Sequence, residues 1–121
     1  MCSSDLPTTL IGQKSQTTPY GRSAANDGYP IKVCELLNAL EGPYYLERTS
    51  VSTAVDRNKT KNAIKKAFQY QLEGRGFSLV EVLSQCPTNW GMQPVEALKW
   101  VNETMKAAFP PGVFRDRGAK A

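Results

Sequence analysis

The sequence of 121 residues contains no histidine, only three cysteines and no long apolar run. Without histidine the commonest general base of enzymes is missing, which excludes most hydrolytic triads. Cys2, Cys34 and Cys86 are odd in number, widely spaced and form no CxxC pair, so the chain alone predicts neither a disulfide framework nor a closed metal site. No apolar run approaches the ~20 residues that span a bilayer, and no signal-peptide pattern is present. A cytoplasmic protein without membrane contact is therefore expected.

The composition indicates one globular domain with a modest core, because apolar residues make up 40% of the chain. The net charge of +4 comes from 15 basic and 11 acidic residues. Basic side chains interleaved with aromatic ones, as in nucleic-acid platforms, are absent, so no nucleic-acid partner is expected. The simplest interpretation is a solvated helix face and a loose end, and the alternative is a docking surface for an acidic protein. The basic clusters are Lys59, Lys61, Lys65 and Lys66, and Arg115, Arg117 and Lys120.

The most informative stretch covers residues 77–100. Residues 77–83 have the length and composition of a buried strand, and residues 84–91 are a polar loop with proline and glycine. Strand–loop–helix units place functional loops at the carboxyl ends of strands in open α/β sheets, and Cys86 lies at that position. The helix opens at Pro94, and its apolar stripe comprises Val95, Leu98, Val101 and Met105.

Upstream, a mostly apolar and therefore buried helix is expected over residues 31–40, with Cys34 as a core cysteine. A strand over residues 44–51 precedes a helix that starts from an N-cap at Asp56 and ends near Glu73. The expected core stripe of that helix is Ile64, Ala67, Phe68 and Leu72.

The order strand, helix, strand, helix over residues 44–109 predicts two parallel strands with flanking helices. Two parallel strands are a poor independent fold, because both edges stay open and little sheet is covered. Residues 30–109 therefore look like one part of a larger α/β domain, followed by a flexible basic tail over residues 110–121.

Two segments precede this α/β part. Residues 1–6, MCSSDL, have no structural link to the rest of the chain and are expected to be a non-native junction, since they match the translation of a sequencing-adapter end. Residues 7–29 predict a long polar loop, and loops of this length are functional or disordered. Disorder is the simpler interpretation. The alternative is a segment that wraps an anionic cofactor with hydroxyls, backbone donors and Lys14 or Arg22.

Cys86 has three interpretations from the residues alone: a buried loop thiol, a nucleophile, or one ligand of a metal or iron–sulfur site completed elsewhere. The missing histidine argues against the nucleophile. Pro87 favours the ligand, because cluster-binding cysteines often precede proline. Trp90 and Trp100 are expected to pack beneath the loop. Glu81, the charge inside the strand, either points to solvent or pairs with a basic neighbour.

Several ordered stretches carry a family resemblance: Pro7-Thr8-Thr9 with Gly12-Gln13-Lys14, Thr18-Pro19-Tyr20-Gly21-Arg22, Gly28-Tyr29-Pro30, and the block from Phe77 to Gly91. With them the sequence resembles the C-terminal part of the β subunit of the 2-oxoacid:ferredoxin oxidoreductases, which depend on thiamine diphosphate. It is more similar to the subfamily acting on 2-oxoglutarate or branched-chain 2-oxoacids than to the pyruvate type.

The resemblance implies a partial thiamine-diphosphate-binding fold and a role in oxidative decarboxylation of a 2-oxoacid to acyl-coenzyme A, with reduction of ferredoxin. The implied partners are the α subunit, ferredoxin, the 2-oxoacid and coenzyme A. The implied cofactors are thiamine diphosphate, Mg2+ and a four-iron cluster (4Fe-4S), of which Cys86 would be the last ligand. The residues implied to line the thiamine site are Thr8, Thr9, Gln13 and Lys14.

The departures from the family pattern are large. The Gly-Asp-Gly segment that binds the diphosphate through Mg2+ and the CxxC that supplies further cluster ligands are both absent. The chain therefore carries no catalytic residue of its own, and a subunit fragment inactive alone is expected. The alternative is a small non-catalytic module that docks an acidic electron-transfer protein through its basic helix.

Overall fold

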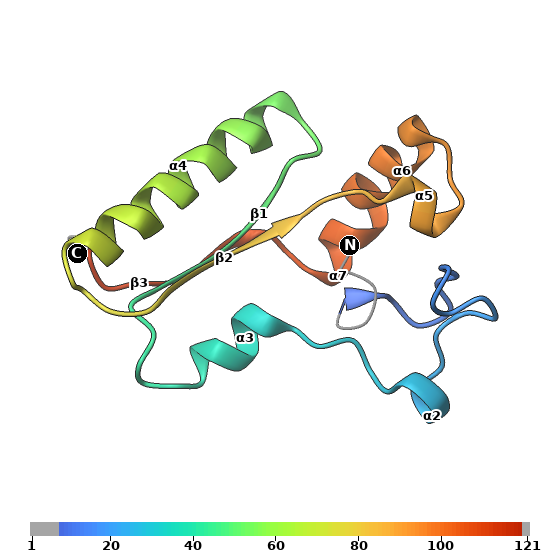
Figure 1. Cartoon of the computed structure of the whole chain (residues 1–121), viewed down its shortest axis with the longest axis horizontal. Helices are drawn as coiled ribbons and strands as arrows, with labels where there is room; N and C mark the ends of the chain where they lie inside the picture. Colours follow the sequence, from blue (N-terminus) through green and yellow to red (C-terminus); the bar gives the residue numbers. More distant parts are fainter. Residues whose placement is uncertain (1–7, 120–121) are drawn as a thin grey trace.

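The computed structural model describes residues 8–119, which form a mixed three-stranded sheet with helices on both faces (Figure 1). The strands are β1 (Tyr45–Ser50), β2 (Ser78–Leu83) and β3 (Gly112–Asp116), in the order β2-β1-β3. β1 and β2 are parallel, as the sequence predicts, whereas β3 is antiparallel to β1. The expected junction over residues 1–6 lies outside the described residues.

The helices form two groups. α4 (Ala54–Leu72) covers one face of the sheet and α3 (Val33–Asn38) lies on the opposite face (Figure 1). The second group lies beyond the carboxyl end of β2 and comprises α5 (Pro87–Trp90), α6 (Pro94–Trp100), the π-helical turn η1 (Val101–Met105) and α7 (Lys106–Ala108). The helix expected from Pro94 is present, but its middle turn is wider than an α-helical turn, which the apolar pattern does not indicate.

α4 begins at a different residue from the predicted one. The N-cap is Thr53, whose extended backbone lets its hydroxyl accept a 3.1 Å hydrogen bond from the backbone N–H of Asp56. The prediction of Asp56 as N-cap is wrong, because Asp56 lies three residues after the N-cap, in the first turn of the helix. Its carboxylate instead accepts from Lys106 Nζ at 2.7 Å, which ties the start of α4 to α7.

The prediction of a loose tail is wrong for Gly112–Asp116, which pairs with β1 as β3. Arginine side chains make this pairing possible, because they reach carbonyls that a turn leaves unpaired. Arg115 donates to the carbonyls of Asn38 at 2.6 Å and Leu40 at 2.6 Å. Asp116 accepts from Lys66 Nζ at 3.0 Å, which ties the end of the strand to α4.

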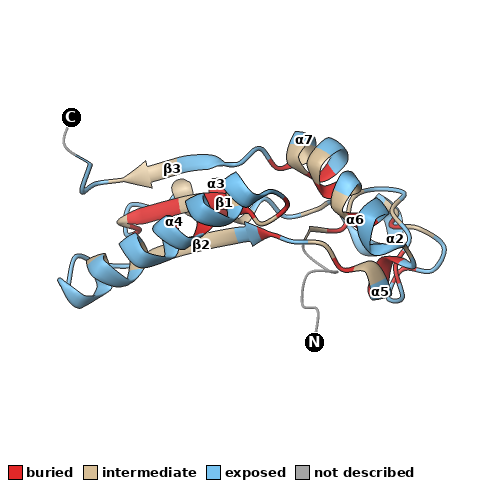
Figure 2. Ribbon diagram, turned by 90° about the horizontal axis from the view of Figure 1, so that it is seen from above, coloured by how far each residue is buried: buried red, intermediate tan, exposed pale blue. Residues whose placement is uncertain are grey.

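Buried residues gather on β1, among α5 to α7 and in the N-terminal segment around Arg22 (Figure 2). The second cluster consists of Leu83, Cys86, Trp90, Ala97, Val101, Met105 and Phe109. Val101 and Met105 are buried as predicted, but Val95 of the expected stripe is 80% exposed and Ala97 is buried instead. The helix therefore packs with a face rotated slightly from the predicted one.

Two helix faces expected in the core are exposed. In α3, Cys34 is fully buried as predicted, but Leu36 is 61% exposed. In α4 the buried residues are Thr60 and Ala63, whereas Phe68 of the predicted stripe is 64% exposed. The prediction that these faces lie in the core is therefore wrong within the described residues, because no described element covers them.

Arg48 of β1 is the centre of a buried ion-pair cluster. Its side chain has no exposed surface and makes two bonds to Glu35 of α3, at 3.0 and 2.5 Å, and one to Glu81 of β2, at 2.8 Å. Glu81 thus pairs with a basic neighbour, the second of its two sequence interpretations. The guanidinium also lies over the rings of Phe109, at 5.4 Å, and Phe114, at 5.0 Å. Burial disfavours the charged form, but the carboxylate bonds outweigh this cost and raise the pKa of Arg48.

Replacing Arg48 by alanine should lower the free energy of unfolding by about 3–5 kcal/mol, because it leaves Glu81 as a carboxylate with no buried countercharge. Chemical denaturation followed by circular dichroism measures the change. Arg57→Ala is the matched control: Arg57 is exposed and makes no ion pair within the described chain, so its loss should change stability by less than about 0.5 kcal/mol. Equal effects of the two substitutions would contradict a central role for Arg48.

The free energy of unfolding should fall in acid because of Glu35. Hydrogen bonds from Arg48 lower the pKa of Glu35 below its ordinary value of 4.5. A lowered pKa means that the unfolded state binds protons more readily, so the contribution of Glu35 is complete above about pH 4.5 and is lost as the pH falls through the folded-state pKa. Glu35→Gln should reduce the difference in unfolding free energy between about pH 6 and about pH 3. Glu96→Gln, at an exposed position without an ion pair in the described residues, should leave that difference unchanged.

Candidate functional site

The candidate site begins at the carboxyl end of β2, where residues 84–91 contain the short helix α5. Pro87 occupies its first turn, and the N–H of Trp90 donates to the carbonyl of Cys86 at 3.0 Å. Gly91 ends the helix with a φ of 64°, a left-handed conformation that favours glycine. The predicted loop is thus a tight helical turn with Cys86 at its start.

Cys86 is 9% exposed and packs in the apolar cluster beneath this turn. Trp90 belongs to the same cluster, and its ring lies 5.0 Å from that of Trp100 at a tilt of 56°. This confirms that the two tryptophans pack beneath the loop. The position of Cys86 just past the strand is also as predicted.

Residues 8–29 are ordered around Arg22, so the prediction of a disordered end is wrong for them. Arg22 is 6% exposed. Its guanidinium donates to four backbone carbonyls, those of Thr9 at 3.2 Å, Asp27 at 3.1 Å, Gly28 at 3.0 Å and Tyr29 at 3.3 Å. Arg22 therefore holds the segment together, and the suggestion that it contacts an anionic cofactor is wrong for this residue.

The four residues implied to line the thiamine site have different environments. Thr9 is 3% exposed, whereas Thr8 is half-buried. The side-chain oxygen of Gln13 accepts a 2.9 Å bond from the N–H of Leu10 and so closes a turn. Lys14 is exposed at the tip of this turn. Of these four, Lys14 is thus the residue that offers a cation to an incoming ligand.

The N-terminal segment and the α5 turn meet in space. The N–H of Gln16 donates to the carbonyl of Asn89 at 3.0 Å. Next to this bond lies a pocket of about 380 Å³, to which the N-terminal segment contributes Gln13 and Lys14 and the helical part contributes Trp90 and Trp100. Lys14 also lines an adjacent hollow of about 270 Å³ together with Thr88 and Asn89. Thr8, Thr9 and Cys86 do not line either pocket.

Two polar atoms of residues near Cys86 in sequence are buried and have no hydrogen-bond partner within residues 8–119. They are Oε1 of Gln85 and Nδ2 of Asn89. Buried polar atoms are nearly always paired in complete structures, so each marks a place where a further group fits. Within residues 8–119 no three His, Cys, Asp or Glu side chains come together as a metal site. A four-iron cluster needs four thiolates, so this chain can contribute one ligand but cannot hold a cluster alone.

The sequence interpretation allows a basic partner for Glu81 but does not identify Arg48 as that partner, nor Glu35 as the second carboxylate. Arg48 and Glu35 are 13 residues apart in sequence and Arg48 and Glu81 are 33 apart, so no local pattern joins them. A single arginine within an otherwise buried strand is the one available signal, because buried charges are paired.

The chain is similar in sequence to subunits of two 2-oxoacid oxidoreductases. It is 42% identical over 114 residues to ketoisovalerate oxidoreductase subunit VorA of Methanothermobacter marburgensis. It is 38% identical over 102 residues to 2-oxoglutarate synthase subunit KorB of the same organism, and 31% identical to the KorB subunit of Methanocaldococcus jannaschii. The chain is homologous to these 2-oxoacid oxidoreductase subunits.

The homologous segment covers 94% of this chain but 24% of the VorA subunit, and 80% of this chain but 32% of the first KorB subunit. The chain thus spans between a quarter and a third of the oxidoreductase subunits it matches. No family model and no solved structure matches it. Across residues 8–119 no helix has both the length and the apolar character needed to cross a membrane.

The thiol of Cys34 should resist alkylation in the folded protein. It is fully buried, and burial together with a hydrogen bond from the thiol to Glu81 raises the pKa of Cys34 to about 12. At about pH 8 almost no thiolate forms, and iodoacetamide reacts with the thiolate. Mass spectrometry should find the Cys34 peptide unmodified in the native protein and fully modified in denaturant. Equally fast modification in both states would contradict the burial of this thiol.

Proposed function

We propose that this chain is part of the β subunit of a 2-oxoacid:ferredoxin oxidoreductase and is inactive alone. The proposal rests chiefly on the meeting of the two segments that carry the resemblance. Gln13 and Lys14 share a pocket with Trp90, and Cys86 belongs to the same buried apolar cluster as that tryptophan. A thiamine-binding segment and a cluster-binding cysteine have to be neighbours if electrons pass from the one cofactor to the other. The homology to VorA and KorB supports the same conclusion.

Thiamine diphosphate, when bound, stabilises the carbanion that forms at the 2-oxo carbon of the substrate. In the proposed subunit Lys14 offers its charge to the anionic cofactor at the pocket mouth. Gln13 fixes the turn that presents Lys14, through its bond to Leu10. Thr8 and Thr9 precede this turn, and Arg22 holds the carbonyl of Thr9 in place. The diphosphate and Mg2+ need the Gly-Asp-Gly segment, which another part of the subunit supplies.

Cys86 is the proposed ligand of a four-iron cluster, with three other thiolates from outside this chain. The unpartnered Nδ2 of Asn89, three residues after Cys86, supports the proposal, since sulfur atoms of such clusters accept hydrogen bonds from nearby donors. The burial of Cys86 is also suitable, because a low-dielectric shell tunes the potential of a cluster.

The proposed substrate is a 2-oxoacid that is decarboxylated to an acyl-coenzyme A, with an α subunit and ferredoxin as partners. The names of the relatives, ketoisovalerate oxidoreductase and 2-oxoglutarate synthase, define this substrate class. The pocket lined by Trp90 and Trp100 is large enough for part of a cofactor or an aliphatic chain.

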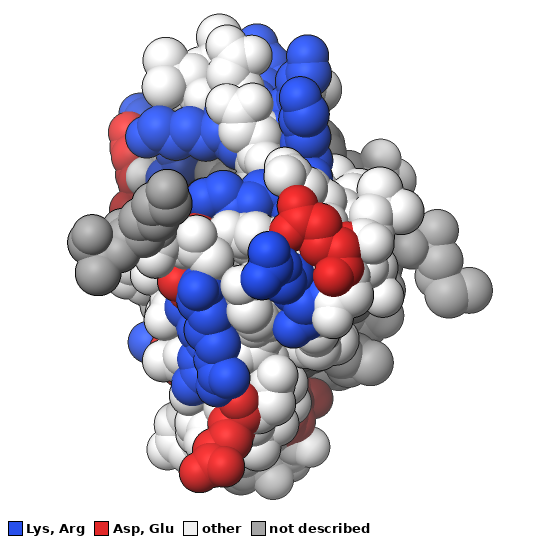
Figure 3. Space-filling view, turned by 90° about the vertical axis from the view of Figure 1, so that its left-hand side faces the viewer, with Lys and Arg blue, Asp and Glu red and all other residues white. Residues whose placement is uncertain are grey.

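The alternative, a docking module that uses a basic helix, has weaker support. Lys61 and Lys65 lie four residues apart on one face of α4, whereas Lys59 and Lys66 lie seven apart on another. Lys66 is moreover paired with Asp116 at 3.0 Å. At the end of the molecule near the α4 carboxyl terminus, acidic side chains are interspersed among the basic ones (Figure 3). The lysines therefore do not form one platform, which favours the subunit proposal.

The cluster assignment can be tested in a chimera of M. marburgensis VorA in which the homologous segment is replaced by residues 8–119 of this chain. Cys86→Ala should lower the iron content and the visible absorbance of the cluster, because one of the four thiolates is lost. Cys34→Ala is the matched control, since Cys34 is also buried but its thiol is bonded to Glu81. It should retain the cluster.

Unchanged iron in the Cys86→Ala chimera would refute the ligand assignment. Loss of iron in both variants would show that folding, rather than ligation, limits cluster assembly, and would remove the support for Cys86.

A further inference from the structure

A hollow of about 450 Å³ lies at the amino ends of β1 and β2, at the opposite end of the sheet from Cys86. The carboxyl end of α4, the turn that follows it and the end of β3 supply its walls, and we call it the arginine hollow. Figure 3 shows this end of the molecule, where basic side chains cover more of the surface than acidic ones do. The charged and aromatic lining residues are Tyr44, Lys66, Tyr70, Glu73, Arg75 and Arg117.

Glu73, the acidic residue in the wall of the arginine hollow, is already hydrogen-bonded through both of its oxygens. Oε1 accepts from Nε2 of Gln69 at 2.9 Å, and Oε2 accepts from Nε of Arg75 at 3.1 Å. The charge of Glu73 is therefore offset by a neighbouring guanidinium. The wall offers no unpaired carboxylate oxygen to a cation that enters the hollow.

Asp116, next to the hollow at the end of β3, is paired in the same way. Oδ2 accepts from Nζ of Lys66 at 3.0 Å, and Oδ1 accepts from Oη of Tyr70 at 2.9 Å. Oδ1 also accepts from the backbone N–H groups of residues 118 and 119, at 3.0 and 3.1 Å. Only 7% of the Asp116 side chain is exposed, so this second carboxylate is enclosed by donors of the chain itself.

The side-chain donors of the wall are, in contrast, largely unused. Arg75 bonds through Nε alone, so its Nη1 and Nη2 have no partner within residues 8–119. Arg117 donates from Nη2 to the carbonyl of Glu41, and its Nε and Nη1 have no partner in the same range. The hydroxyl of the half-buried Tyr44 makes no hydrogen bond to the described chain either. The hollow therefore has donors to offer and few acceptors.

Unused donors beside occupied acceptors favour a ligand that is rich in acceptor oxygens. A guanidinium presents its N–H groups in one plane and matches the oxygens of a phosphate group in pairs. The three cations of the wall stand against the single carboxylate of Glu73, so the net charge also favours an anion. The rings of Tyr44 and Tyr70 meet edge to face at 5.0 Å and give the same hollow an aromatic wall.

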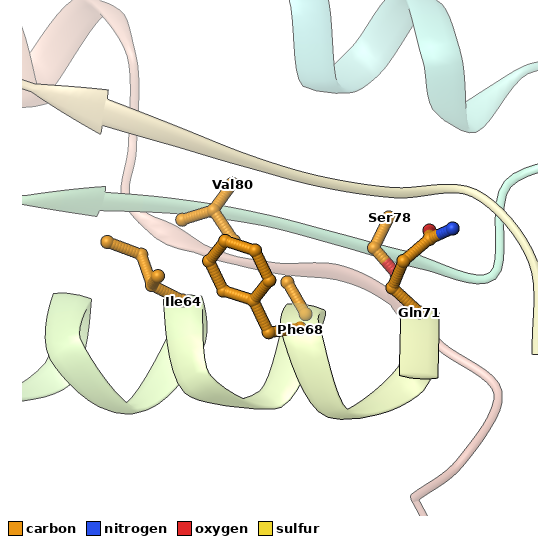
Figure 4. Close-up of a pocket in the computed structure, with 6 residues that line it drawn as sticks. Ile64, Phe68, Gln71, Ser78 and Val80 are labelled. Atoms are coloured by element: carbon orange, nitrogen blue, oxygen red, sulfur yellow. The ribbon is translucent and has the colours of Figure 1, made fainter. Parts of the chain in front are cut away.

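The other hollow beside α4 has a different character. It has a volume of about 250 Å³, and in it Phe68 of α4 faces Val80 of β2, with Ile64 beside them (Figure 4). None of the described residues that line it carries a charge. An anion would lose its hydration there without gaining a countercharge, which is costly. Of these two hollows, the arginine hollow is therefore the one suited to an anionic ligand.

We propose that the arginine hollow binds an organic phosphate. The phosphate oxygens accept from Arg75 and Arg117, and the organic part packs against Tyr44 and Tyr70. A volume of about 450 Å³ is within the usual range of small-molecule sites and exceeds what inorganic phosphate alone needs. This binding goes beyond the proposed function and does not rest on it, because none of these residues belongs to the segments that carry Lys14 and Cys86.

Isothermal titration calorimetry of the full chain, with ATP as the probe, tests this site. ATP should bind with one site per chain at an ionic strength of about 0.15 M, at which long-range attraction between exposed charges is largely screened. Pyrophosphate should bind more weakly, because it lacks an organic part, and adenosine should not bind, because it lacks the phosphates. No heat of binding at about 1 mM ATP, or adenosine binding as tightly as ATP, would overturn the proposal.

Substitutions locate the binding. Arg75→Gln and Arg117→Gln should each weaken ATP binding at least about tenfold, since each removes charge-assisted hydrogen bonds. Arg75→Lys keeps the charge but loses the planar pair of donors, and should weaken binding about threefold or more. Arg57→Gln is the matched control at an exposed arginine near the other end of α4, and should leave the affinity unchanged.

Full affinity in Arg75→Gln, or an equal loss in Arg57→Gln, would show that ATP binds elsewhere or through net charge alone, and would refute the site. Melting curves followed by circular dichroism check the fold of each variant. Arg75→Gln decides the test if Arg117→Gln alters the melting curve, because Arg75 makes a surface ion pair whose loss costs little stability. ATP binding by this chain and the iron content of the VorA chimera are independent measurements, so each can fail without the other.

Discussion

The buried guanidinium of Arg48 is the interaction on which the rest of the structure depends. It lies on the central strand and bonds to one carboxylate from α3 and one from β2, while the rings of Phe109 and Phe114 enclose it. Four elements that are far apart in sequence thus meet at one charge. A buried charge is tolerated only with paired partners in good geometry, so this contact restricts how the elements can be arranged more than it adds stability. With Glu81 held inward, the end of β2 and the turn that carries Cys86 are fixed relative to the sheet.

The elements that could be predicted from the sequence are those whose causes are local. β1, β2, α4 and α6 belong to this group, because apolar spacing, proline and glycine act within a few residues. β3 could not be predicted, since its pairing depends on Arg115 reaching carbonyls more than seventy residues away in the chain. The exposed stripe of α4 was mistaken for core for the opposite reason. Apolar spacing indicates which face of a helix is suited to burial, but it does not show whether another element covers that face, and Phe68 is 64% exposed.

In the candidate site, too, features with local causes could be predicted and features that depend on distant contacts could not. The position of Cys86 after a strand, and the packing of Trp90 on Trp100, follow from the order of residues. That Gln13 and Lys14 would share a pocket with those tryptophans could not be read from the chain, because it depends on how residues 8–29 fold back across α5. Oε1 of Gln85 and Nδ2 of Asn89 are buried and have no hydrogen-bond partner within the described residues, which marks places where a further polar group fits.

The way Arg22 organises the N-terminal segment has an evolutionary consequence. Its guanidinium donates to four backbone carbonyls, which every amino acid provides, so the side chains of those four residues can change without loss of these bonds. Gly12, Gly21 and Gly28 are the exceptions, because their φ values of 80°, 89° and 71° disfavour any other residue. The curved backbone of this segment therefore constrains one arginine and three glycines.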